Sequence, residues 1–219
     1  KYTNRTEVIA FTGAFHGRTL LTMTLTSKVK PYKIGFGPFA PGIHRIEFPY
    51  AYRSPEYLSK DDITNYYIYK LEKFFLENVE PENVAAIILE PIQGEGGFIV
   101  PPDDYIKELR RICDKYGILL IADEIQSGYC RTGKMFATEY WAENGVYADI
   151  VTSAKSIAAG LPLSAVTARA EIMECAQVGG IGGTYCGNPI STTAALKVIE
   201  IMERDNYAEK ANNVAAITM

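Results

Sequence analysis

The sequence lacks the features that mark several large classes of protein. No apolar run approaches the 18 residues that a membrane-spanning helix needs, and the polar start at residues 1–5 has no apolar segment suited to a signal peptide. Acidic side chains outnumber basic ones, 26 against 22, so no basic face for nucleic-acid phosphates is expected. These absences predict a protein that acts on neither membranes nor nucleic acids.

Side chains that bind metals or form disulfides are also scarce. The four cysteines, at positions 113, 130, 175 and 186, include no CxxC pair. The two histidines, His16 and His44, do not have the spacing of metal ligands. Four thiols in a chain of 219 residues do not make a disulfide framework. We therefore expect no metal site, reduced cysteines and a cytoplasmic location.

What the sequence contains is an alternation of strand and helix patterns. With 47% hydrophobic residues, the chain can bury one sizeable core or two small ones. Continuous apolar or β-rich runs predict strands at 7–11, 84–89, 118–122, 149–154 and 163–168. Amphipathic spacing predicts helices at 61–79, 103–116 and 189–204, whereas 19–26 fits either structure. Asp61 or Asp62 is expected to cap the first helix, and Gly117 to end the second.

This alternation predicts an α/β fold, a mostly parallel sheet with helices on both faces. In such sheets, ligands bind at the carboxyl ends of the strands. Ionisable residues stand at three of these ends: Glu90 after VAAIIL, Asp123 and Glu124 after ILLIA, and Lys155 after DIVTSA. We expect these side chains to meet in one site.

Lys155 and Asp123 have the most specific surroundings among these residues. Lys155 lies among small and apolar residues, where poor solvation would make its amine a nucleophile and Schiff-base former; the alternative is an ordinary surface lysine. Asp123 leaves a buried strand and needs a partner, which could be a metal, a protonated ring nitrogen or an internal arginine. A DE pair after a strand also occurs in nucleotide hydrolases, but their GxxxxGK[ST] loop is absent.

Three loops add groups suited to binding small anions. The glycine-rich loop at 179–189 opens the last helix and could hold a phosphate or serve as a flexible connector. The loop at 91–97 is also glycine-rich and carries Glu95. At 15–19 an aromatic ring stands beside Arg18, which could bind a carboxylate bidentately or lie solvated at the surface.

Five blocks of the sequence resemble, in order, those of the class III pyridoxal-phosphate aminotransferases of fold type I. They are AFHGRT at 14–19, LEPIQGEGG at 89–97, LLIADEIQSGYCRTGKMFA at 119–137, SAKSIAAGLPLSAV at 153–166 and GGTYCGNP at 182–189. The stretches at 35–53 and 161–166 resemble the 4-aminobutyrate branch, although acetylornithine and ornithine aminotransferases share AFHGRT. The resemblance implies an aspartate-aminotransferase-like large domain and pyridoxal phosphate as cofactor. It also implies transfer of an amino group from an ω-amino acid such as 4-aminobutyrate to 2-oxoglutarate.

The same resemblance implies a role for each candidate site residue. Lys155 would form the Schiff base with the cofactor and move the proton, and Asp123 would pair with the pyridinium nitrogen. The other cofactor contacts would come from Phe15, His16, Glu124, Ile125, Gln126 and, across the interface of a homodimer or dimer of dimers, Thr184. The substrate contacts would come from Arg18 on a carboxylate, from Glu90, and from Glu95 as a switch between the two half-reactions.

Members of this family are considerably longer than 219 residues. We therefore expect residues 1–219 to be the cofactor-binding large domain, with an N-terminal segment and a small C-terminal domain missing and with little or no turnover as an isolated piece. Two alternatives stay open. One is another class III enzyme, such as an acetylornithine- or ornithine-type aminotransferase. The other is a non-catalytic binding module of the same fold.

Overall fold

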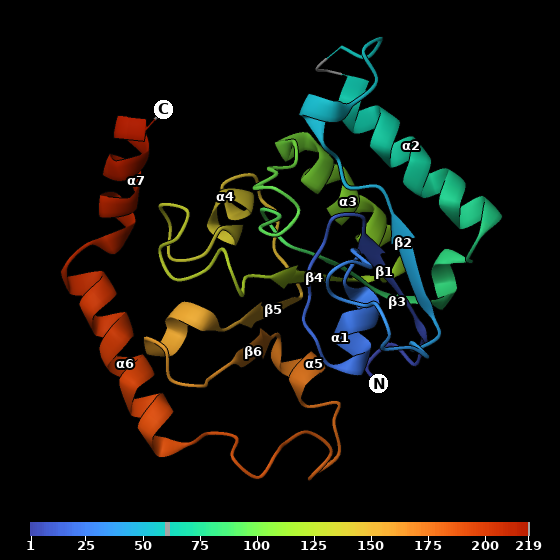
Figure 1. The fold of residues 1–219 in the computed structure, drawn as a ribbon. Coiled ribbons are helices and arrows are strands. Elements are labelled where there is room, and N and C mark those ends of the chain that lie inside the picture. The colour runs from blue at the N-terminus through green and yellow to red at the C-terminus, as the bar shows by residue number, and fades with distance from the viewer. Residues whose placement is uncertain (60–61, 219) are drawn as a thin grey trace.

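The computed structural model describes residues 1–59 and 62–218, which form a six-stranded sheet with helices around it (Figure 1). The strands are β1 (Glu7–Phe11), β2 (Ile43–Ile46), β3 (Val84–Leu89), β4 (Leu119–Asp123), β5 (Ile150–Ser153) and β6 (Ala165–Ala168). The helices are α1 (Leu20–Leu25), α2 (Asp62–Glu77), α3 (Asp103–Tyr116), α4 (Thr138–Ala142), α5 (Ala170–Met173), α6 (Pro189–Arg204) and α7 (Tyr207–Thr218). No helix in this described part is long and apolar enough to cross a membrane.

The sheet is mixed but mostly parallel, as predicted. Its strand order is β2-β1-β3-β4-β5-β6, and every neighbouring pair is parallel except β5 and β6. The chain between Ser153 and Ala165 is too short for a helical crossover, so β6 returns antiparallel to β5. The central strand β3 is almost wholly buried, which explains its continuous apolar sequence.

Apolar side chains on both faces of the sheet hold the helices in place. Ile9 and Phe11 of β1 point into the main core, which α2 and α3 cover side by side (Figure 1). Ala10 points to the opposite face, where it packs with Leu25 of α1 and Ile88 of β3. Successive strand residues alternate between faces, so one strand contributes to both cores.

The predicted helix boundaries are largely confirmed, with differences that have local causes. α3 ends at Gly117, whose φ of +64° is the left-handed conformation that glycine adopts most readily. Ile118 is not a strand residue, contrary to prediction, because its N–H closes this helix end by donating to Cys113 O at 2.8 Å. β4 therefore begins one residue later and includes Asp123. The expected cap Asp61 lies outside the described residues.

Several short or exposed elements carry too weak a pattern to be predicted. The ambiguous segment 19–26 forms α1, and the unpredicted elements are β2, α4, α5 and α7. The predicted strand 163–168 shortens to β6, because its first two residues stay outside the ladder with β5. These differences lie away from the central strands that position the site.

Candidate active site

The carboxyl ends of β1, β3, β4 and β5 meet at one edge of the sheet, where a small cavity of about 80 Å³ opens. Its lining residues come from these strand ends and the loops after them: Phe15, His16, Gly17, Glu90, Asp123, Ile125, Gln126 and Lys155. The structure thus brings Glu90, Asp123 and Lys155 together, as their places after parallel strands predict. Gly17 was not among the predicted site residues.

Asp123 and His16 form a buried pair at the base of the cavity. His16 Nδ1 lies 2.7 Å from Asp123 Oδ2, and the two side chains are 1% and 5% exposed. Asp123 Oδ1 accepts a hydrogen bond from the Ile125 N–H at 3.1 Å. His16 Nε2 is buried and has no hydrogen-bond partner in the described part of the chain. The pair holds a nearly buried carboxylate in a fixed orientation in the lining of the cavity.

Glu90 is a second buried carboxyl group beside this pair. Its two oxygens accept hydrogen bonds from the Phe15 N–H at 3.1 Å and the Gly94 N–H at 3.2 Å. Burial raises the pKa of the Glu90 carboxyl above its ordinary value, and these two N–H groups offset part of that rise. Glu90 therefore joins the loop after β1 to the loop after β3 and shapes the cavity between them.

Lys155 stands at the open side of the cavity. Its backbone φ of +50° places a non-glycine residue in the left-handed region, a strain found most often at functional sites. Its Nζ donates a hydrogen bond to Gln126 Oε1. The expectation that Lys155 is poorly solvated is wrong for the described chain. The residue is exposed, since the turn that follows at 159–161 is itself exposed and leaves it uncovered.

Four predicted site residues do not line the cavity: Glu124, Thr184, Arg18 and Glu95. The Glu124 carboxylate is fully buried away from it, accepting hydrogen bonds from the Ser127 hydroxyl at 2.5 Å and the Thr138 N–H at 2.6 Å. Glu124 thus ties the loop after β4 to the start of α4, because its side chain points to the opposite side of the strand end from that of Asp123. Thr184 lies exposed in the loop before α6 and does not line the cavity.

Arg18 and Glu95 lie near the cavity, joined by a tyrosine that sequence analysis missed. The Tyr32 hydroxyl donates to Glu95 Oε2 at 2.6 Å, and this hydrogen bond raises the pKa of the Tyr32 phenol. The guanidinium carbon of Arg18 lies 5.1 Å from the Tyr32 ring centre and 5.9 Å from that of Phe15. Lys28 Nζ donates to Glu95 O at 2.7 Å. The only signal for Tyr32 in the sequence is an aromatic residue within a basic loop.

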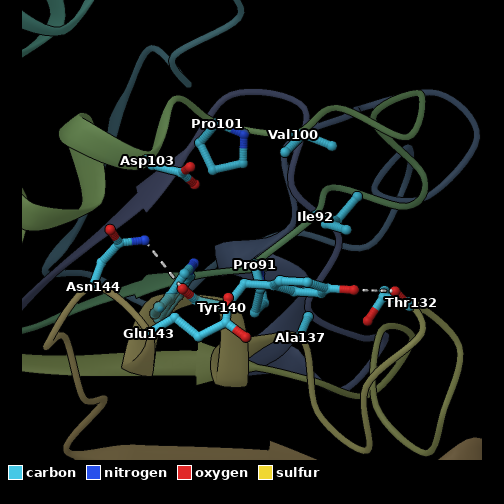
Figure 2. Close-up of a pocket in the computed structure, with 11 residues that line it drawn as sticks. Pro91, Ile92, Val100, Pro101, Asp103, Thr132, Ala137, Tyr140, Glu143 and Asn144 are labelled. Carbon is cyan, nitrogen blue, oxygen red and sulfur yellow. Dashed lines mark hydrogen bonds between the residues drawn. The ribbon is translucent and has the colours of Figure 1, made fainter. Parts of the chain in front are cut away.

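A larger cavity, of about 340 Å³, lies between the loop after β3 and α4 (Figure 2). Pro91, Ile92, Val100 and Pro101 supply much of its apolar lining. Figure 2 shows the hydroxyl of Tyr140 directed at Thr132, whose carbonyl oxygen it meets at 2.8 Å. No lysine or histidine lines this cavity in the described part of the chain. The smaller cavity is the candidate active site, because it alone of the two gathers an amine, carboxylates and an imidazole.

Comparison with known proteins places the chain among aminotransferases. The sequence family described as class-III aminotransferase matches residues 1–219. The chain is 46% identical over 217 residues to a probable 4-aminobutyrate aminotransferase of Bacillus subtilis, covering 99% of this chain and 49% of that protein. It is 48% identical over 212 residues to the 5-aminovalerate aminotransferase DavT of Pseudomonas putida, covering 97% of this chain and 48% of that protein.

The fold agrees with that of solved transaminases. A PLP-bound amine transaminase from an uncultivated Pseudomonas species aligns with a TM-score of 0.87 and 34% identity, over 97% of this chain and 49% of that chain. The chain thus spans about half the length of the curated relatives it matches.

Proposed function

The chain belongs to the class-III aminotransferase family, and from that membership we propose that it is the cofactor-binding half of a pyridoxal-phosphate-dependent transaminase of ω-amino acids. The observation that carries the proposal is the meeting of Lys155 and Asp123, from neighbouring parallel strands, in one cavity. An amine and a buried carboxylate on opposite sides of a cavity suit a ligand with an aldehyde and a basic ring nitrogen.

The residues of the cavity fit pyridoxal phosphate by their chemistry. Asp123 offers a fixed carboxylate for a protonated pyridine nitrogen, and Gln126 offers an amide for the ring hydroxyl. Phe15 and Ile125 supply apolar surface for the two faces of the ring. Among the lining residues in the described part of the chain there is no arginine for the phosphate, so we assign no phosphate contact within the cavity.

Each residue then has a defined task. When bound, pyridoxal phosphate supplies an aldehyde that captures amines and a ring that accepts electrons. Lys155 Nζ would hold the cofactor through its aldehyde and would serve as the base and acid that moves a proton on the substrate. Asp123 keeps the ring nitrogen protonated, and His16 holds the Asp123 carboxylate in orientation through its 2.7 Å contact. Glu90 lines the site and braces the loop that carries Phe15.

The residues proposed to bind substrate form the cluster around Tyr32. A four- or five-carbon ω-amino acid, the class named for the two relatives, carries its carboxylate at the far end from the reacting amine. Arg18 is proposed to bind that carboxylate, since its guanidinium lies beside two aromatic rings and forms no hydrogen bond or ion pair with the described part of the chain. Glu95 is proposed to pair with a cation when the ω-amino acid is bound and to release it for 2-oxoglutarate.

The assembly and location are also proposals. We infer a homodimer or dimer of dimers in which Thr184, on its exposed loop, reaches the phosphate of the cofactor bound to the neighbouring subunit. We further infer a cytoplasmic location, in which the four free cysteines remain reduced.

Borohydride trapping tests the proposal. The intact protein is incubated with pyridoxal phosphate and reduced, and the modified lysine is mapped by mass spectrometry. We expect stoichiometric label on Lys155, loss of that label in Lys155→Ala, and full label in the control Lys197→Ala, whose lysine is exposed on α6. Label scattered over many lysines would refute the proposal. Profiling of amino donors then separates 4-aminobutyrate and 5-aminovalerate from ornithine-type substrates.

A further inference from the structure

The C-terminal end of α1 is held mainly by Arg45 of the edge strand β2, and Lys33 Nζ donates to the Thr26 carbonyl as well, at 3.0 Å. Arg45 Nη2 donates to the carbonyl oxygens of Thr24, Leu25 and Thr26, at 2.7, 3.1 and 3.1 Å. The last carbonyls of a helix have no partner within the helix, and a cation there also meets the negative end of the helix dipole. Arg45 therefore fixes the position at which the chain leaves α1.

Thr26 connects this clamp to the candidate active site. The residue is fully buried, and its Oγ1 accepts a hydrogen bond from the His16 N–H at 3.0 Å and lies 3.1 Å from Gly17 O. One residue further on, the Ser27 N–H donates to Ala14 O at 2.8 Å. The loop that carries His16 thus rests on the end of α1.

His16 completes a continuous path of contacts to the cavity. Its imidazole meets the Asp123 carboxylate at 2.7 Å. Arg45 itself does not line the cavity, because it sits on β2 in register with Ala10 of β1. Any movement of the α1 end is therefore passed to His16 through Thr26, and from His16 to the carboxylate.

The chemistry of Arg45 suits this task better than simple surface capping. The guanidinium is half-buried, and burial lowers its pKa, although it stays charged at neutral pH. In the described part of the chain its partners are backbone carbonyls, and no carboxylate pairs with it. All three hydrogen bonds come from the one nitrogen Nη2, and the buried Nε has no partner in the described part of the chain, so a lysine ammonium can replace part of this clamp.

We propose that Arg45 is a positioning residue of the candidate active site. Its clamp on residues 24–26 sets the place of Thr26 and, through it, the orientation of His16 toward Asp123. This inference rests on the proposed function in one respect, which is that the Asp123 carboxylate faces the bound cofactor.

Hydrogen exchange in the cofactor-free intact protein tests the positioning directly. In Arg45→Met, which keeps an apolar stem but has no donor, we expect the His16 amide to exchange faster, because Thr26 Oγ1 no longer holds it in place. Arg45→Lys is expected to restore part of the protection. Arg111→Met is the matched control, since Arg111 is exposed on α3 and bonds Glu108 at 2.7 Å; it should leave the His16 amide unchanged.

The loaded protein gives a second readout. We expect Arg45→Met to shift the pH midpoint of the cofactor absorption band and to raise the cofactor Kd roughly tenfold, by analogy with the lower end of the losses at metal sites when the partner of a metal-binding side chain is removed. A lower Tm with unchanged exchange at His16 and an unchanged pH midpoint would overturn the proposal, leaving Arg45 as a helix cap only.

A further variant tests the second link of the path, from Thr26 to His16, and stays available if Arg45→Met does not fold. Thr26→Val has a similar volume but lacks Oγ1, so it should also speed exchange at His16; ordinary protection there would equally overturn the proposal. Failure of the proposed function gives a different result, in which wild type takes no label at Lys155 while the exchange differences remain.

Discussion

Replacing His16 by alanine leaves a buried carboxylate without its main partner. Asp123 Oδ2 loses the imidazole at 2.7 Å, while Oδ1 keeps the Ile125 N–H at 3.1 Å as its partner in the described part of the chain. The carboxylate is only 5% exposed, so it has little contact with bulk solvent to offset the loss of the ring. Removing one partner of a buried pair costs about 3 kcal/mol or more, and the space left by the ring adds about 1 kcal/mol. We expect the free energy of unfolding to fall by about 4 kcal/mol.

The same chain contains a matched control. His44 Nε2 lies 2.8 Å from Glu7 Oε2, almost the same distance, but these side chains are 26% and 25% exposed. Because water can solvate Glu7 once the ring is gone, His44→Ala is expected to cost about 1 kcal/mol or less. Burial, rather than distance, decides the difference between the two variants.

Urea unfolding of the cofactor-free intact protein at neutral pH measures these costs. A second substitution, Asp123→Asn, removes the charge that His16→Ala leaves unpaired, so the double variant should recover about 2 kcal/mol relative to the sum of the single changes. The reasoning would be refuted if the losses of unfolding free energy in His16→Ala and Asp123→Asn added up to that of the double variant within about 0.5 kcal/mol. It would also be refuted if His16→Ala and His44→Ala lost the same unfolding free energy.

Three further predictions concern the loops around the cavity. Because burial raises the folded-state pKa of Glu90, ionisation of this carboxyl destabilises the fold as the pH rises above the ordinary pKa of 4.5. The free energy of unfolding of wild type, relative to that of Glu90→Gln, should therefore decline from pH 4.5 toward neutral pH. A difference that stays constant with pH in urea titrations would contradict this prediction. A Cβ at Gly94 would lie 2.8 Å from the Gln126 side chain, so Gly94→Ala should displace it and weaken cofactor binding roughly fivefold by absorption titration, as loss of one hydrogen bond of about 1 kcal/mol predicts. Tyr32→Phe removes the 2.6 Å hydrogen bond to Glu95 and should raise the KM for the ω-amino acid roughly fivefold with little change in kcat. An unchanged KM would show that this hydrogen bond does not contribute to substrate binding.

Much of the site could be predicted from local sequence because parallel strands impose a simple rule. Their carboxyl ends lie at the same edge, so a polar residue directly after each apolar run must approach the others. That rule brings together Glu90, Asp123 and Lys155 without any knowledge of distances. The main helices are equally local, since α3 is set by its apolar spacing and by a glycine that can adopt a φ of +64°.

The rule does not determine where each side chain points. Glu124 follows Asp123 directly, yet its carboxylate is fully buried in the loop before α4, because successive residues at a strand end face opposite sides. Lys155 is exposed although its neighbours in the sequence are small and apolar. The solvation of a side chain depends on which residues pack against it in space, and not on which residues precede and follow it in the sequence.

The sequence by itself determined all strands of the sheet except β2, the edge at which the site lies and the kinds of side chain that meet there, because alternation and strand ends are local patterns. Only the tertiary structure decided that Tyr32 holds Glu95, that Thr26 holds His16 and that Arg45 clamps α1. These partners are separated by between 10 and 63 positions in the sequence. Such contacts form only once packing has set the distance between loops, and no periodicity in the chain encodes that distance.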